Sequence, residues 1–179
     1  MVRESKYSKE RQVILKEPFL SEQHTRRLGG SPTNVAYDYG VGTFNGVSSY
    51  IVYDKLFNKT GCSIRIGVRN PSFADGDILV DFRGTGGSAY ITLAERSPLT
   101  PSPQGSGSKN YYVNAVLDAS LDTTDSEYTE IVITDLDIYG FLTIGAAWDL
   151  SGDWISSGLD LFEIYNYELS QSEVSNLYH

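Results

Sequence analysis

Pairs of acidic side chains are the residues of this sequence that could cleave a glycosidic bond. Cleavage with retention of configuration needs two carboxylates about 5 Å apart. On one strand this requires acids at positions i and i+4, because alternate side chains share a face. Asp135 and Asp137 are two residues apart, but the positions that would extend the series hold Ile133 and Tyr139. The sequence therefore predicts carboxylates at a loop edge rather than a catalytic pair.

The remaining acids and the histidines offer no better catalytic arrangement. Asp160 and Glu163 are three residues apart, which places them on opposite faces of a strand. His24 and His179 lie near opposite ends of the chain, so a Ser-His-Asp or zinc site would need them to meet by chance. No glycine-rich phosphate loop is present. We therefore expect no enzymatic activity.

Aromatic and planar polar side chains could instead hold a sugar. A pyranose has an apolar CH face ringed by hydroxyls, so its site combines a flat apolar surface with hydrogen-bonding groups. Trp154 lies among small polar residues, and Arg65, Arg69 and Asn114 occupy non-core positions of their expected strands. We predict these four as ligand-binding residues. A structural reading stays open: Trp154 would cover the end of the fold, and the arginines would pair with surface acids.

Length, charge and composition limit the function further. The 179 residues suit one domain, and 13 Tyr with 17 Gly fit many short strands joined by turns. Residues 1–30 carry seven basic and four acidic side chains, a net charge of +3, whereas residues 31–179 carry seven basic and nineteen acidic, a net of −12. The body has no basic stripe for a phosphate backbone, so we expect no nucleic-acid partner.

Nothing in the sequence indicates a membrane span or a disulfide. Cys62 is the only cysteine, so no internal disulfide can form. No stretch approaches the ~20 apolar residues of a spanning helix, so we expect no membrane insertion. The start, MVRESKYSKERQ, lacks the apolar stretch of a signal peptide.

Turn residues and alternating patterns divide the chain into short strands. Residues 12–20 read as a first strand broken by Pro18, with a helix over residues 5–15 as the alternative. We predict an N-terminal arm, residues 1–16, that could act as a tether, followed by a sandwich domain over residues 17–179. Residues 29–34, GGSPTN, read as a turn.

Later elements follow the same logic. Residues 41–52 indicate two strands around a turn at Asn45–Gly46, since Asn-Gly strongly favours hairpins. Residues 62–69 alternate strictly, with Cys62, Ile64, Ile66 and Val68 on one face and Ser63, Arg65, Gly67 and Arg69 on the other. A proline- and serine-rich stretch over residues 97–110 predicts a long exposed loop. Further strands are expected at residues 78–82, 89–94, 111–117, 129–134 and 141–147.

The chain ends in a buried strand followed by a capped helical turn. Apolar residues are dense over residues 159–165. Ser170 is a suitable N-cap, and Glu173 lies three residues later, as in a capping box. Leu169, just before the cap, then Val174 and Leu177 lie on one side of this turn.

This C-terminal segment resembles the closing signature of the laminin-G-like jelly rolls, within the concanavalin A-like lectin/glucanase superfamily. The resemblance implies an all-β fold, a two-sheet antiparallel β-sandwich of the concanavalin A-like jelly-roll type with a short C-terminal helical turn. It covers roughly residues 41–178. The matching residues are Gly158, Leu159, Asp160, Ile164, Tyr165, Asn166, Leu169, Ser170, Glu173, Val174, Leu177 and Tyr178.

Earlier segments resemble the same family, with departures. Phe44 to Gly46, followed by Tyr50-Ile51, match its pattern, and Tyr112 to Asn114 resemble a family hairpin in which Ala115 replaces glycine. Gly67 stands where the family usually has tryptophan, which would open space or remove a stacking surface. As a cofactor, the resemblance implies Ca²⁺ at Asp160 with backbone carbonyls near Asn45–Gly46.

Three functions remain open from the sequence. The first is a non-catalytic binding module of a virus or phage particle, such as a capsid decoration or fibre protein. Its expected partners are glycans or neighbouring protein subunits, in a homo-oligomer or larger assembly on the virion surface. The second is a carbohydrate-binding module of a bacterial surface or secreted protein, located extracellularly or on the cell surface. The third is a glucanase-like hydrolase, which activity abolished by Asp135→Asn would support.

Overall fold

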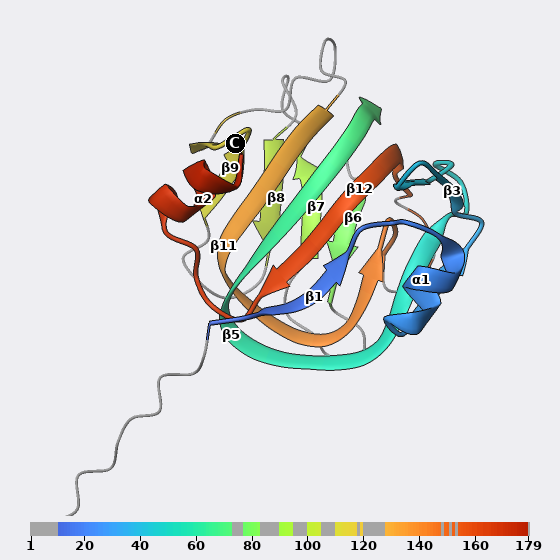
Figure 1. Ribbon diagram of the computed structural model, residues 1–179, viewed down its shortest axis with the longest axis horizontal. Coiled ribbons are helices and arrows are strands. Elements are labelled where there is room, and N and C mark those ends of the chain that lie inside the picture. Colours follow the sequence, from blue (N-terminus) through green and yellow to red (C-terminus); the bar gives the residue numbers. More distant parts are fainter. Residues whose placement is uncertain are drawn as a thin grey trace, which may run out of the picture.

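The computed structural model describes residues 11–72, 77–82, 90–94, 100–104, 110–117, 119, 128–147, 149, 150, 152 and 154–178. Within them the chain is all-β with two short helices (Figure 1). The helices are α1, Glu22–Arg27, and α2, Gln171–Leu177. The strands are β1 Val13–Glu17, β2 Gly30–Thr33, β3 Ala36–Asp38, β4 Val41–Thr43, β5 Tyr50–Ser72, β6 Ile78–Asp81, β7 Tyr90–Ala94, β8 Thr100–Gln104, β9 Asn110–Val113, β10 Val116–Leu117, β11 Tyr128–Ile144 and β12 Ser156–Tyr165.

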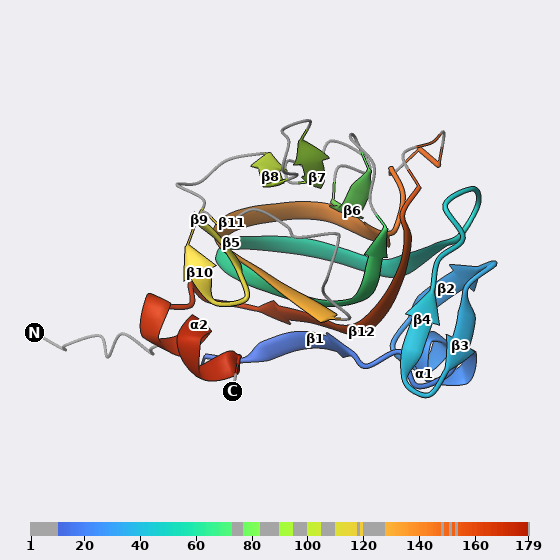
Figure 2. The same ribbon diagram turned by 90° about the horizontal axis from the view of Figure 1, so that it is seen from above.

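Two long strands, β5 and β11, build both layers of the sandwich. They pair with each other and turn sharply together (Figure 1). One layer contains β3, β4, β1 and β12 beside the second half of β5, then the first half of β11 with β9 and β10. The other contains β2 beside the first half of β5, then the end of β11 with β6, β7 and β8 (Figure 2). All these pairings are antiparallel, which confirms the predicted fold class.

Positive backbone angles and bulges explain the bend. Gly61 has φ +60° in β5, and Asp135 has φ +56° in β11. The register of β11 on β5 shifts on both sides of Leu136, and extra residues of this kind bend a strand. Residues 41–52 and 62–69 were predicted as separate strands, as were 129–134 and 141–147. Residues 50–52 and 62–69 both belong to the bent strand β5, and residues 129–134 and 141–144 both belong to the bent strand β11.

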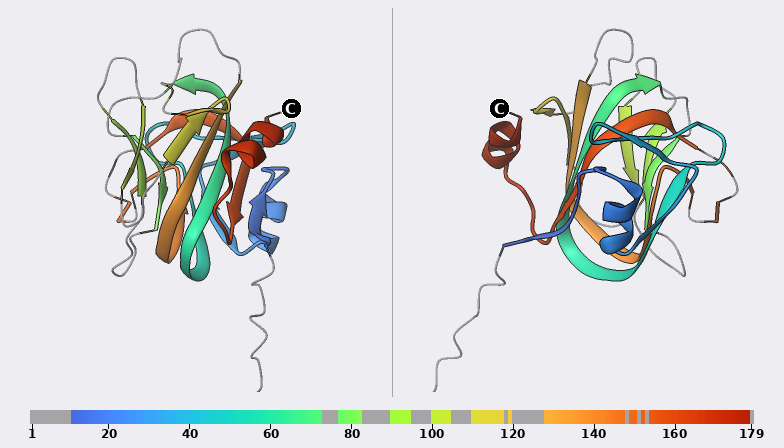
Figure 3. Two further views of the ribbon diagram at one scale, coloured as in Figure 1. Left: turned by 90° about the vertical axis from the view of Figure 1, so that its left-hand side faces the viewer. Right: turned by 45° about the vertical axis from the view of Figure 1, so that its right-hand side comes forward.

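The core lies between the two layers. Ile64, Ile66 and Val68 are fully buried on the inner face of β5, which confirms the predicted alternation. Phe162 and Ile164 of β12 join them. Outside the β12–β5–β11 layer, α2 forms a second, smaller cluster (Figure 3), whose buried members are Tyr112, Val132, Tyr165, Leu169 and Val174.

The C-terminal prediction is confirmed. Strand β12 lies between β4 or β1 on one side and β5 on the other. The Ser170 amide donates to Glu173 Oε2 at 2.9 Å, and the Glu173 amide donates to Ser170 Oγ at 3.4 Å, forming the predicted capping box.

Two predictions for residues 20–50 are wrong. Residues 29–34 contain β2, because helix α1, capped by Ser21, packs against it: a Cβ on Gly30 would lie 2.6 Å from Thr25 Cγ2. The turn at Asn45–Gly46 does not join a hairpin, since β4 pairs with β12 and β5 pairs with β2. It belongs to the connection over residues 44–49, which runs from β4 in one layer to β5 in the other and is called the arch below. In the arch, Asn45 Oδ1 accepts hydrogen bonds from the backbone amides of Val47, Ser48 and Ser49.

Other differences concern the chain ends and the proline-rich stretch. β8, Thr100–Gln104, lies inside the predicted loop 97–110 and pairs with β7 at the end of the strand order, where proline is tolerated. Residues 13–16, assigned to the arm, are part of β1, and the alternative helix is wrong for residues 13–15. Residues 1–10 lie outside the described residues, so a tether there stays a prediction.

Candidate functional site

A row of side chains crosses the outer face of the β4–β12–β5–β11 layer. The strand registers place Tyr128 opposite Arg69, Arg69 opposite Gly158, and Gly158 opposite Thr43. Residues directly opposed in an antiparallel sheet point to the same face. The Arg69 side chain is 48% exposed, Thr43 is exposed and Tyr128 is half-buried. The row therefore sets Gly158, which is buried and has no side chain, between the Thr43 hydroxyl and the Arg69 guanidinium, with the Tyr128 phenol beyond Arg69.

Gly158 lies in a shallow depression of about 330 Å³. A Cβ at this position would lie 2.7 Å from Val41 Cγ1 and 3.2 Å from Arg69 Cβ, so the side chains of Val41 and Arg69 already pack over the Gly158 backbone and a larger residue would displace them. The exposed side chains of Arg69, Thr43 and Ser156 form a polar rim. Among the described residues, the lining is Val41, Thr43, Phe44, Arg69, Ser156, Ser157 and Gly158.

A β-bulge brings Asp160 beside Arg69. The register of β12 on β5 shifts between Leu159 and Leu161, and a bulge of this kind re-aims the inserted side chain. Arg69 Nε donates to Asp160 Oδ2 at 2.8 Å. The other oxygen, Oδ1, is buried and has no hydrogen-bond donor among the described residues. The carboxylate fixes the guanidinium and offsets part of its charge.

The missing side chain at Gly67 leaves room for Asp160 and Tyr128. A Cβ there would overlap Asp160 Oδ1 and lie 2.9 Å from the Tyr128 hydroxyl. The space left by the missing tryptophan is therefore filled by these two side chains. Burial, with the nearby negative charges of Glu130 and Asp160, raises the pKa of Tyr128 to about 12. Its hydroxyl is therefore protonated at neutral pH, and the Arg69 guanidinium carbon lies 5.0 Å from its ring centre.

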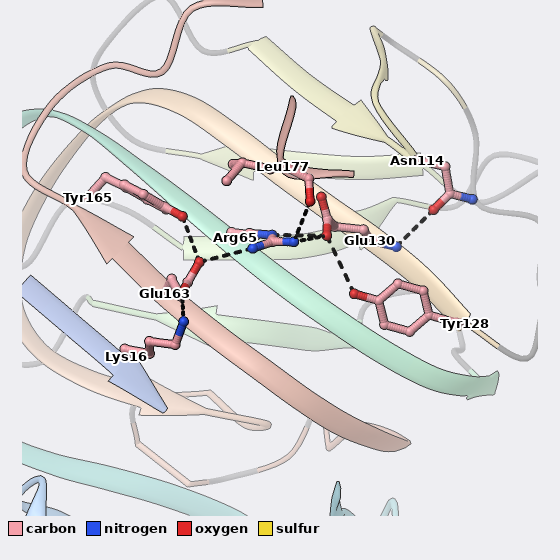
Figure 4. A network of polar contacts seen from close by, with 8 residues as sticks. All are labelled: Lys16, Arg65, Asn114, Tyr128, Glu130, Glu163, Tyr165 and Leu177. Carbon is pink, nitrogen blue, oxygen red and sulfur yellow. Dashed lines mark hydrogen bonds and ion pairs between the residues drawn. The ribbon is translucent and has the colours of Figure 1, made fainter. Parts of the chain in front are cut away.

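Arg65, two residues before Gly67 on the same face, has a different environment (Figure 4). Its Nη2 donates to Glu130 Oε2 at 2.6 Å and to the Leu177 carbonyl at 2.8 Å. Its Nη1 donates to Glu163 Oε2 at 3.3 Å. The side chain is 16% exposed, and the two glutamates are 2% and 4% exposed. Arg65 thus links β5, β11, β12 and the end of α2. These contacts use its guanidinium within the fold and leave little of it exposed to solvent.

The lowered pKa of Glu163 predicts that the fold loses stability at acid pH. Burial alone would raise its pKa, but hydrogen bonds from Lys16 and Tyr165 and the charges of Lys16 and Arg65 outweigh burial and lower the pKa. A carboxyl with a lowered folded-state pKa stabilises the fold above its ordinary value and loses that contribution as the pH falls. We expect the urea midpoint to decline as the pH falls below 4.5. Glu163→Gln should flatten that decline, and an equally steep profile in this variant would contradict the assignment.

The other two predicted ligand residues lie apart from the depression. Asn114 occupies a tight turn with Ala115, at φ +50° and +64°, and its Oδ1 accepts the Glu130 amide at 2.9 Å. Trp154 packs on Tyr50, with ring centres 5.6 Å apart. The structure therefore brings only Arg69 of the four to the depression, and Asp160 to its side. Ligand binding by Arg65, Asn114 or Trp154 stays a prediction.

Asp135 and Asp137, predicted as carboxylates at a loop edge, both lie within β11. Asp137 Oδ1 accepts the Gly61 amide at 3.2 Å at the bend of β5. In the described part of the chain, no three His, Cys, Asp or Glu side chains gather as a metal site. Calcium at Asp160 stays a prediction. Neither described helix is long and apolar enough to cross a membrane.

Comparison with solved structures identifies the fold. Domain 4 of the extracellular arabinanase AbnA from Geobacillus stearothermophilus, solved with arabinotriose, aligns with 84% of this chain and 88% of that domain, at 14% identity and a TM-score of 0.56. A sialidase from Trypanosoma rangeli, solved with the inhibitor DANA, aligns with 83% of this chain but 29% of its own, at 16% identity and a TM-score of 0.52. The chain shares the β-sandwich fold of these structures.

Sequence comparison assigns no family. No protein-family model matches the chain, and no curated protein sequence is significantly similar to it. The similarity to solved structures is one of fold. Membership of the laminin-G-like group therefore stays a prediction.

Sequence reasoning missed Gly158, Thr43 and Tyr128 as parts of the site. Gly158 was identified only as the first residue of the closing motif. Its role depends on the register that sets it between Arg69 and Thr43. The signal available in the sequence was the absence of a side chain between polar strand positions, which marks a place where a neighbouring group, here Val41, can approach the backbone closely.

Proposed function

We propose that this protein is a non-catalytic module that binds a neutral glycan in the depression around Gly158. The observation that carries the proposal is the depression on the outer sheet face in which Arg69 and Thr43 flank Gly158. An apolar floor with a polar rim matches a sugar ring, whose CH face is ringed by hydroxyls.

Charge favours a neutral sugar over an acidic one. Arg69 is already paired with Asp160 at 2.8 Å, so its remaining N–H groups can donate to hydroxyls without attracting a further anion strongly. The chain carries a net charge of −9, which opposes the approach of a negatively charged glycan. The arabinotriose bound to the AbnA domain of the same fold supports this choice.

Removal of the Arg69 guanidinium tests the proposal. Hydrogen bonds from a charged group contribute about 1.5–3 kcal/mol, so Arg69→Ala should weaken arabinotriose binding about 10- to 100-fold in calorimetric titration. Arg26→Ala is the matched control, because Arg26 is 53% exposed and paired with Glu22 on α1. Equal affinities of the Arg69→Ala and wild-type proteins would exclude this depression as the site, and a preference for sialic acid would exclude the neutral class.

A narrower form of the proposal places this module on a virus or phage particle, as a capsid decoration or fibre protein that contacts glycans or neighbouring subunits. The basic N-terminal region, with a net charge of +3 over residues 1–30 against −12 for the remainder, supports an attachment role for the arm. Because β1 begins at Val13, only the residues before this strand could serve as a tether without loss of a strand.

A further inference from the structure

The tip of the β3–β4 hairpin presents an aromatic residue in a strained conformation. Tyr39 and Gly40 form the two-residue turn between Asp38 and Val41, with φ of +46° and +78°. Positive φ at both positions is the geometry of a type I′ turn, which favours Asn, Asp or Gly. A bulky residue at the first position is an outlier, so the hairpin alone does not explain Tyr39.

Contacts with the other described residues do not explain it either. The Tyr39 side chain is 98% exposed. Within the described residues it makes no ring contact and no side-chain hydrogen bond. Leu20, 59% exposed, lies beside the same turn, 3.9 Å from the place a Cβ on Gly40 would occupy. An exposed aromatic ring on strained backbone points to a contact outside the chain.

The turn adjoins the depression described above. Val41, which follows Gly40 directly, lines the depression, and Thr43 lines it further along the same strand. Tyr39 thus continues the line of β4 beyond the depression, at the end away from the arch. A chain of sugar units that begins beside Arg69 and runs along β4 would reach its ring.

We propose that Tyr39 is a second sugar subsite, which rests on the proposed function and extends it from a single sugar to an oligosaccharide. Its ring stacks on the apolar face of the unit next to the one held by Arg69. A tyrosine ring offers a large flat surface with little rotamer freedom to lose. The strained turn holds that ring clear of the sheet, where a neighbouring sugar unit lies.

Oligosaccharide length provides the test. Calorimetric titration of the full chain should show that Tyr39→Ala weakens arabinotriose binding about tenfold, a change typical of one lost aromatic contact, and leaves arabinose binding unchanged. Tyr39→Phe should retain wild-type affinity, because the ring and not the hydroxyl makes the contact. Tyr178→Ala, which removes another exposed tyrosine at the end of α2, should behave like the wild type.

Stability gives an independent readout. Tyr39→Gly should raise Tm by relieving the positive φ while lowering arabinotriose affinity. Wild-type arabinotriose affinity in both Tyr39→Ala and Tyr39→Gly, with the Arg69→Ala effect intact, would overturn the subsite and leave the proposed function standing. Absence of saccharide binding by the wild-type chain would overturn both.

Discussion

Replacing Arg65 with methionine should lower the free energy of unfolding by about 3–5 kcal/mol at neutral pH, the usual cost of removing one partner from a buried ion pair. Arg65 lies between Glu130 and Glu163, whose side chains are 2% and 4% exposed. Without the guanidinium, Glu130 loses its ion-pair partner, and only Lys16 still compensates Glu163. The Leu177 carbonyl also loses its donor, so α2 should loosen.

Urea denaturation at neutral pH measures this effect. Arg26→Met is the matched control, since its ion pair with Glu22 is exposed and should change stability by less than about 0.5 kcal/mol. Adding Glu130→Gln to Arg65→Met should restore part of the loss, because it removes an uncompensated buried charge. A loss below about 1 kcal/mol in Arg65→Met would show that the cluster does not hold the outer face together.

Gly145→Ala should lower the free energy of unfolding by about 2–5 kcal/mol, because this glycine follows the end of β11 and packs against Phe44. Gly145 has φ +84°, and a Cβ there would lie 2.6 Å from two ring carbons of Phe44. Phe44 is 1% exposed, so its ring has little room to move. The positive φ accounts for about 1–2 kcal/mol, and crowding of the core for about 1–3 kcal/mol.

Substitutions at two other glycines distinguish the effect of the positive φ from that of crowding against Phe44, in the same urea denaturation assay. Gly29 has a similar φ, +88°, with nothing within 4 Å of a Cβ, so Gly29→Ala measures the backbone effect alone. Gly152 has no positive φ and no described atom within 4 Å of a Cβ, so Gly152→Ala should be nearly neutral. If Gly145→Ala costs no more than Gly29→Ala, Phe44 does not pack as tightly against this turn as the structure indicates.

Local patterns predicted the elements whose physics is local. The capping box of Ser170 and Glu173 depends on residues three apart, and the alternation of Ile64, Ile66 and Val68 depends on the period of a strand. Both are confirmed. The hairpin at Asn114, which the family resemblance implies, also forms, and its turn divides residues 111–117, predicted as one strand, into β9 and β10.

The elements and contacts that the sequence did not predict depend on packing between residues far apart in the chain. Residues 29–34 read as a turn, but pairing with β5 makes four of them a strand, with Gly30 packed under α1. Arg65 and Arg69 occupy equivalent positions in the alternation, but α2 docks over the first and leaves the second exposed. The helix was predictable from sequence, whereas the place where it docks was not. For that reason only Arg69, of the four residues predicted to bind a ligand, lies at the depression.

The most direct test of glycan binding at Gly158 is a titration of arabinotriose into isotope-labelled protein, followed by the backbone amide chemical shifts. We predict that the largest shifts at saturation fall on Thr43, Arg69 and Gly158, on three neighbouring strands, and that they disappear in Arg69→Ala. Shifts confined to another face, such as residues 58–60 at the bend of β5, or no shifts at millimolar sugar, would contradict the account.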